Sequence, residues 1–87
     1  MPSSEPTRGA RWLAKVADDY DLGPDGAALA SEIADLLDRA DALREIVASG
    51  PLVVASPQGE KVAPAVGELR ATQALIRQSL ATLGLDD

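Results

Sequence analysis

The feature that most constrains this chain is a long apolar stripe with helical spacing, bounded on both sides by proline. Pro24 precedes the stripe, and Ser49-Gly50-Pro51 follows it. Apolar residues that recur three, four and seven positions apart share one face of an α-helix. The stripe consists of Leu29, Ile33, Leu36, Leu37, Ala40, Leu43 and Val47. This spacing predicts a helix over residues 24–48.

Two further segments have helical spacing. Thr7 is a suitable N-cap for a short helix over residues 8–19, whose apolar face contains Trp12 and Val16. Pro64 suits the first turn of a helix over residues 64–83, and Gly84 suits its C-cap. The apolar stripe of this last helix is formed by Val66, Leu69, Ile76, Leu80 and Leu83. The chain is therefore predicted to be mainly α, with a short N-terminal helix and a long antiparallel helical hairpin.

The segment between the two long helices has a different pattern. Gly50 can end the preceding helix in a left-handed conformation, and Pro51 prevents its continuation. The letters LVV and KVA suit two short strands, and SPQGE between them suits a turn. These features predict a β-hairpin over residues 52–63. A lone two-stranded hairpin is marginal in water, so we expect it to pack on the chain's own helices or on a neighbouring subunit.

Composition limits the classes of function. The chain has 87 residues, with no cysteine and no histidine, so it lacks thiolate metal ligands and the commonest general base. No glycine-rich phosphate loop is present, and we expect neither an enzyme nor a cofactor. Trp12 and Tyr20 are the only aromatic residues, which predicts a thin core that gains stability by oligomerisation.

The chain is predicted to form one helical oligomerisation domain over residues 7–85. A flexible polar arm over residues 1–6 precedes it, and an acidic tail at residues 86–87 follows it. No apolar run approaches the ~20 residues of a membrane span, and the first residues lack the apolar core of a signal peptide. These observations predict an intracellular protein without a membrane partner.

Charge gives two opposing indications. The net charge of −6 argues against a simple nucleic-acid-binding module. However, Arg8, Arg11 and Lys15 share one face of the first predicted helix, and this face either contacts solvent, binds phosphate or pairs with acidic groups of a neighbour. Arg70 and Arg77 lie two turns apart on one side of the last helix.

A second set of charged residues covers the polar side of the central helix. It consists of Glu32, Asp35, Asp38, Arg39, Asp41 and Glu45. Carboxylates at this density can indicate a metal or acid–base site, but the chain supplies no histidine and no apolar pocket around them. We therefore predict a solvated acidic face.

From about Trp12 to Leu85, the order and spacing of several short segments resemble the phage terminase small subunit family, in the short form found in actinobacterial phages and prophages. These segments are Tyr20-Asp21-Leu22, Leu37 to Leu43, Gly50-Pro51, Gln58-Gly59, Val62-Ala63-Pro64, Glu68-Leu69-Arg70 and Leu80 to Leu85. Ala63 departs from the family, which often has histidine or asparagine there. Many family members carry a separate helix-turn-helix domain, and with seven residues before Arg8 we expect none here.

The resemblance implies a non-enzymatic DNA-packaging component in the cytoplasm of a bacterial host. Family members form rings, here expected to hold about eight or more subunits, which engage double-stranded viral DNA and assist the large subunit that holds the ATPase and nuclease. The expected DNA-binding residues are Arg8, Arg11, Lys15, Arg70 and Arg77. The expected interface residues are Leu52, Val53, Val54, Val62, Leu69, Leu75 and Ile76.

A second hypothesis comes from another class of protein. The chain is then a small helical protein-interaction module, such as a phage assembly factor or an antitoxin-like dimer, without affinity for DNA. The mass of the protein in solution and its DNA affinity at low salt distinguish the two hypotheses. In this second case the hairpin is a local cover for the two long helices.

Overall fold

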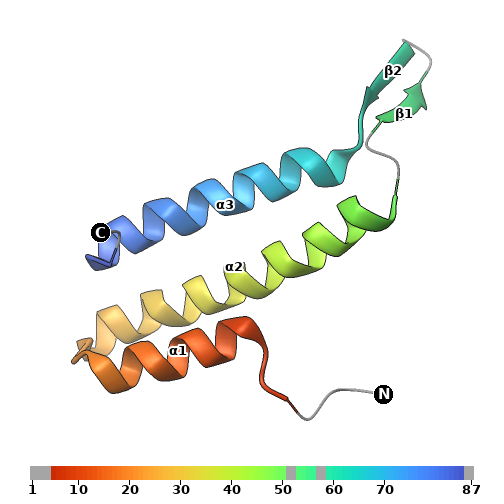
Figure 1. Ribbon diagram of the computed structural model, residues 1–87. Coiled ribbons are helices and arrows are strands. Elements are labelled where there is room, and N and C mark those ends of the chain that lie inside the picture. Colours follow the sequence, from red (N-terminus) through yellow and green to blue (C-terminus); the bar gives the residue numbers. More distant parts are fainter. Residues whose placement is uncertain (1–4, 51–52, 57–58, 86–87) are drawn as a thin grey trace.

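Three helices account for most of the chain (Figure 1). The computed structural model describes the backbone of residues 5–50, 53–56 and 59–85, and the side chains of residues 5–50 and 63–85. The elements are α1 (Arg8–Asp19), α2 (Gly23–Ser49), β1 (Val53–Ser56), β2 (Gly59–Val62) and α3 (Pro64–Leu83). The prediction of a mainly α protein is confirmed, and each helix matches its predicted bounds to within one residue.

The predicted caps explain most of these helix ends. The Thr7 side chain accepts a hydrogen bond from the Ala10 backbone N–H, and Gly84 has the left-handed conformation with φ 87°. The prediction that Gly50 is left-handed is wrong, because its backbone is extended, with φ −123° and ψ 173°. The physical reason is its neighbour: a residue that precedes proline is restricted to extended backbone.

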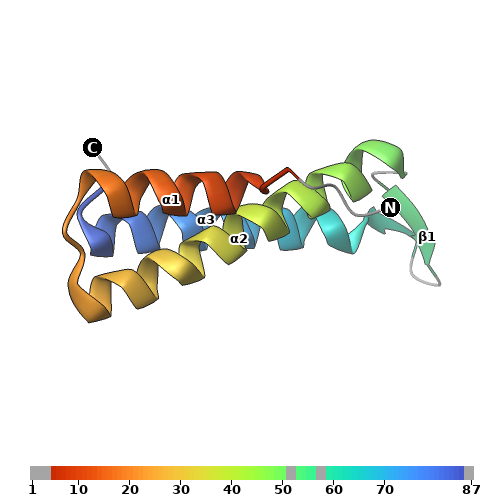
Figure 2. The same ribbon diagram turned by 90° about the horizontal axis from the view of Figure 1, so that it is seen from below.

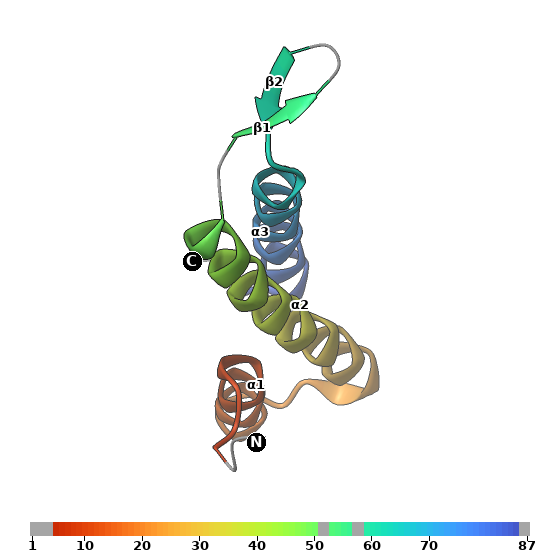
Figure 3. The ribbon, with the colours of Figure 1, turned by 90° about the vertical axis from the view of Figure 1, so that its right-hand side faces the viewer.

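The central helix α2 carries the other two helices on separate sides (Figure 3). It runs antiparallel to both, so α1 and α3 run in the same direction and their C-terminal ends lie at the same end of the molecule (Figure 2). The radius of gyration is 16.0 Å, whereas a compact domain of this length has one of about 12 Å. The chain is therefore elongated and leaves much of its helical surface uncovered.

The core is small and rich in short side chains. The buried apolar residues among those described are Val16, Ala30, Ile33, Ala34, Ala40, Leu43 and Ile76. Ile33 is the largest fully buried side chain among them. Within the part of the chain that the structure describes, none of the helices combines the length and apolar composition needed to span a membrane.

Two short strands extend beyond the helices, at the end where α2 leads into α3 (Figure 1). β1 and β2 pair antiparallel, with Val53 opposite Val62 and Val54 opposite Lys61. Of the predicted interface residues, Leu52 lies outside the described residues, as do the side chains of the three valines. A role of these residues between subunits stays a prediction.

At the joint between α1 and α2 the two backbones lie close together. Gly9 is buried against α2, and a Cβ atom there would lie 2.9 Å from the carbonyl carbon of Ala34 and overlap with its oxygen. Asp38 completes the joint, because its Oδ1 accepts the Gly9 backbone N–H at 2.8 Å and its Oδ2 accepts the Thr7 hydroxyl at 2.8 Å. A carboxylate of α2 thus satisfies a free N–H in the first turn of α1 and complements its helix dipole.

The prediction of a solvated acidic face is consequently wrong for two of its members. Asp38 and Asp41 are half-buried and turn towards α1, where Asp41 forms an ion pair with Arg8 at 3.1 Å. The other carboxylates of this set, among them Glu32 and Asp35, are exposed. One helical face carries both kinds of carboxylate because α1 covers only part of it.

We predict that Gly9→Ala destabilises the protein by about 1–3 kcal/mol, because the added methyl group forces α1 away from the Ala34 carbonyl. Gly67→Ala is the matched control, since a Cβ atom at Gly67 meets nothing within 4 Å in α3. The control should raise stability by up to about 1 kcal/mol through helix propensity. Urea unfolding followed by circular dichroism measures both, and equal effects would contradict the close approach.

We also predict that Asp38→Ala lowers the free energy of unfolding by about 1–2 kcal/mol, because the Gly9 N–H loses its acceptor and the Thr7 hydroxyl loses its partner. Asp35→Ala, one turn earlier and exposed, removes the same charge without touching α1. The same unfolding experiment compares the two variants. A change in Asp35→Ala as large as that in Asp38→Ala would assign the effect to net charge.

Candidate functional site

Two hollows bring residues of α1 together with residues of α3 or of the segment just after it. We call the first the arginine hollow; its volume is about 300 Å³, and it is lined by Arg8, Leu37, Arg44, Gln73, Ile76 and Arg77. We call the second the aromatic hollow; its volume is about 320 Å³, and it is lined by Trp12, Lys15, Val16, Asp19, Tyr20, Gly84 and Leu85. The arginine hollow lies at the start of α1 and beside the middle of α3, and the aromatic hollow lies at the C-terminal ends of both helices.

The arginine hollow brings together one guanidinium group from each helix. Arg8 comes from α1, Arg44 from α2 and Arg77 from α3. Asp41 Oδ1 pairs with Arg44 Nη1 at 2.8 Å and with Arg8 Nη2 at 3.1 Å. Arg77 has no such pair with Asp41. The three arginines that line the hollow therefore exceed the one carboxylate paired with them by two positive charges.

Two of these arginines have unused hydrogen-bonding capacity. Arg8 Nη2 donates to the Leu37 carbonyl oxygen at 3.3 Å, whereas its Nε is buried without a hydrogen-bond partner. Arg77 is exposed and forms no ion pair with any residue that the structure describes. Guanidinium groups stay protonated and present several donors in a planar fork that matches phosphate oxygens. The hollow is therefore suited to binding anions.

The structure separates the basic residues that the sequence had grouped on the first helix. Arg11 donates to the Pro6 carbonyl oxygen at 2.9 Å, and Lys15 pairs with Asp19 on its own helix at 3.2 Å. Only Arg8 of this group reaches the arginine hollow, where it meets Arg77. Arg70 is exposed two turns before Arg77 on α3 and lines none of the hollows described here.

Arg44 was missed in the sequence, although a signal was present. It follows Leu37 by seven residues, so it continues the edge of the apolar stripe and not the polar face of α2. It also follows Asp41 by three residues, which is the spacing of an ion pair on a helix. Because α3 packs on this stripe, Arg44 at its edge lies beside α3.

Acidic and apolar groups gather on the other side of α3. Two adjoining hollows there share Leu36, Arg39 and Leu75, and we call them together the acidic groove. Their rim contains Glu32, Asp35 and Glu68. Residues two positions apart on a helix point about 200° apart, so Leu75 and Arg77 face opposite sides of α3. The arrangement keeps Glu32 and Asp35 away from the arginine hollow.

The predicted interface residues of α3 differ in exposure. Leu75 is 50% exposed in the acidic groove, and Leu69 is half-buried. Ile76 is 9% exposed and packs within the chain, so it belongs to the core and not to a free surface. Ile46 of α2, which the sequence did not single out, is 55% exposed.

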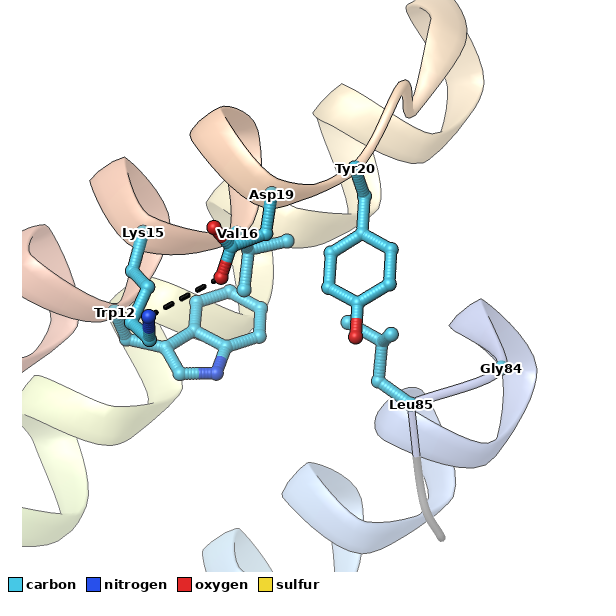
Figure 4. Close-up of a pocket in the computed structure, with 7 residues that line it drawn as sticks. All are labelled: Trp12, Lys15, Val16, Asp19, Tyr20, Gly84 and Leu85. Atoms are coloured by element: carbon cyan, nitrogen blue, oxygen red, sulfur yellow. Dashed lines mark ion pairs between the residues drawn. The ribbon is translucent and has the colours of Figure 1, made fainter.

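The aromatic hollow contains both aromatic side chains of the chain (Figure 4). Trp12 and Tyr20 project from α1 towards the C-terminal end of α3, where Gly84 and Leu85 complete the hollow. The Lys15–Asp19 ion pair lies beside Trp12.

Comparison of the chain with protein-family models, with curated proteins and with solved structures finds no match. Function is therefore inferred from the chemistry of the described residues. Within them, the structure offers a cationic hollow, an acidic groove with exposed leucine and an aromatic hollow. Each of the three lies on a different part of the helical frame.

Proposed function

We propose that this protein is the small subunit of a phage terminase, a non-enzymatic component that assembles as a ring and engages viral DNA during packaging. The order and spacing of the segments from Trp12 to Leu85 support the proposal through their resemblance to that family. The observation that carries it is the meeting of Arg8, Arg44 and Arg77 in a chain whose net charge is −6. Three of its eight basic residues share one hollow.

The arginine hollow is the proposed contact with DNA phosphate. A single subunit offers an excess of only two positive charges there, which is weak for DNA binding. A ring repeats the same excess around its axis, and each phosphate that is neutralised releases a counterion and adds to affinity. The exposed acids of the acidic groove lie away from this surface, so they do not repel the DNA held there.

Assembly is proposed to use the uncovered surface of the helical pair. Leu75 and Leu36 offer apolar area in the acidic groove, and the elongated shape leaves this area open in a single chain. The proposed β-hairpin of β1 and β2 has free backbone edges among the described strands and can extend the joint to a neighbour. Repetition of a head-to-tail contact closes a ring when the rotation allows it.

The remaining parts of the proposal follow from this role. A component with no catalytic group of its own must act with a partner that supplies ATP hydrolysis and DNA cleavage. We propose that the partner is the terminase large subunit and that the site of action is the cytoplasm of the bacterial host. In this ring the arginine hollow contacts DNA, and the acidic groove contacts the neighbouring subunit.

The DNA contact predicts that Arg44→Gln combined with Arg77→Gln weakens binding to double-stranded DNA by at least about tenfold at 50 mM salt. The salt dependence should become shallower, because fewer counterions are released. The single variants Arg77→Gln and Arg39→Gln remove the same charge and form the matched comparison, since Arg39 is an exposed arginine of the acidic groove on the other side of α3. Fluorescence anisotropy with a labelled duplex measures both quantities.

Equal losses in Arg77→Gln and in Arg39→Gln would mean that DNA senses overall charge and not the arginine hollow. Absence of DNA binding by the unmodified protein as an assembled oligomer would reject the DNA contact altogether. Together with a dimeric mass, that result would favour a protein-interaction module.

The assembly step predicts a discrete oligomer of about eight or more chains in light scattering after size exclusion. Leu75→Asp should reduce this mass to that of small species, because burying a carboxylate in an apolar contact costs free energy. Ala81→Asp is the control, since Ala81 is an exposed residue of α3 outside every hollow described here.

A Leu75→Asp variant with unchanged mass would exclude the acidic groove from the joint. Urea unfolding of both variants shows whether the change of mass reflects lost contacts or a lost fold. Leu75 is half exposed in the single chain, so its replacement should cost less than about 1 kcal/mol in monomer stability.

A further inference from the structure

The aromatic hollow is formed where two helix C-termini meet. α1 ends at Asp19 with Tyr20 as its C-cap, and α3 ends at Leu83 with Gly84 as its C-cap. Tyr20, Gly84 and Leu85 all line the hollow. The C-terminal end of a helix carries partial negative charge on its free carbonyl groups, and here two such ends lie side by side.

The acidic side chains near the aromatic hollow add to the partial negative charge of the two helix C-termini. Neither α1 nor α3 has a basic residue in its last turn. Asp19 lines the hollow, and Asp18 and Asp21 are exposed next to it in sequence. Lys15 is the one cation among the residues that line it, and this lysine is already paired with Asp19 at 3.2 Å. The surroundings therefore favour a further cation.

The two rings add a second preference for positive charge. Trp12 is half-buried and Tyr20 is 53% exposed, so each ring keeps part of its surface open to a ligand. The face of an aromatic ring attracts a cation, and arginine also stacks on it through its planar group. Tryptophan and tyrosine are the residue types most often found as anchors of protein interfaces.

We infer that the aromatic hollow is a docking site for an arginine-bearing segment of a partner protein. The guanidinium group stacks between Trp12 and Tyr20 and pairs with the Asp19 carboxylate. Apolar neighbours of that arginine contact Val16 and Leu85 along the wall of the hollow. The inference uses neither the arginine hollow nor DNA, so it stands independently of the proposed packaging function.

The Lys15–Asp19 pair shows how the site accepts such a ligand. Its members are 78% and 45% exposed, so solvent screens the pair and its rupture costs little. Asp19 can therefore exchange the Lys15 ammonium for an incoming guanidinium group, which offers two parallel hydrogen bonds to a carboxylate. Lys15 remains free to turn into solvent.

The chain provides its own reporter for the test, because Trp12 is its only tryptophan. The probe is the tripeptide acetyl-Leu-Arg-Leu-amide, titrated to millimolar concentration while Trp12 fluorescence and ¹⁵N–¹H spectra are recorded. The control probe replaces arginine by citrulline, which has nearly the same shape and no charge. We expect saturable binding of the arginine peptide and affinity at least about fivefold lower for the citrulline peptide.

Variants locate the binding. Tyr20→Ala and Asp19→Asn should each weaken the arginine peptide by about threefold or more, whereas Tyr20→Phe keeps the ring and should bind normally. Asp35→Asn removes the same charge in the acidic groove and should have no effect. Circular dichroism verifies that each variant is folded, and both altered residues are exposed enough to tolerate replacement.

Three results would overturn the inference. The first is the absence of a saturable response to the arginine peptide, and the second is equal affinity for the citrulline peptide. The third is an equal loss in Asp19→Asn and Asp35→Asn, which would show that the peptide responds to net charge alone. None of these results bears on the affinity for DNA, so the two proposals fail separately.

Discussion

The hydrogen bonds that Asp38 accepts from the start of α1 fix the place of α1 on α2, and with it the two hollows that α1 lines. Asp38 accepts hydrogen bonds from the Gly9 N–H and the Thr7 hydroxyl where the Gly9 backbone lies against the Ala34 carbonyl group. With its N-terminus fixed there, α1 follows α2 antiparallel, and Arg8 enters the arginine hollow. The same direction carries Trp12 and Tyr20 to the C-terminal end of α3.

The distribution of charge matters more in this chain than its sum. A net charge of −6 describes an acidic protein, yet the three helices bring Arg8, Arg44 and Arg77 to one place and leave Glu32 and Asp35 on the far side of α3. Electrostatic attraction acts over about 10 Å at moderate salt, so a ligand senses the local group of charges. An acidic chain can therefore present a cationic surface.

The thin core and the open surface have the same origin. The helices pack closely through small residues such as Gly9 and Ala34. Small residues bury little apolar area. The elongated frame leaves Leu75 and Ile46 half exposed, which a stable assembly would cover. In the proposed ring, stability and function depend on the same contacts between subunits.

The sequence by itself determined the three helices and most of their ends. The signals for these ends act on a few neighbouring residues; they are the N-cap at Thr7, the prolines at Pro24 and Pro64, and the C-cap at Gly84. The tertiary structure alone decided which side chains meet. Asp38 and Gly9 are 29 residues apart in the chain, and their contact depends on how α1 crosses α2. Helical period assigns a residue to a side of its own helix, but it does not reveal which neighbour covers that side; the arginine hollow and the aromatic hollow therefore became visible only when the helices were packed together.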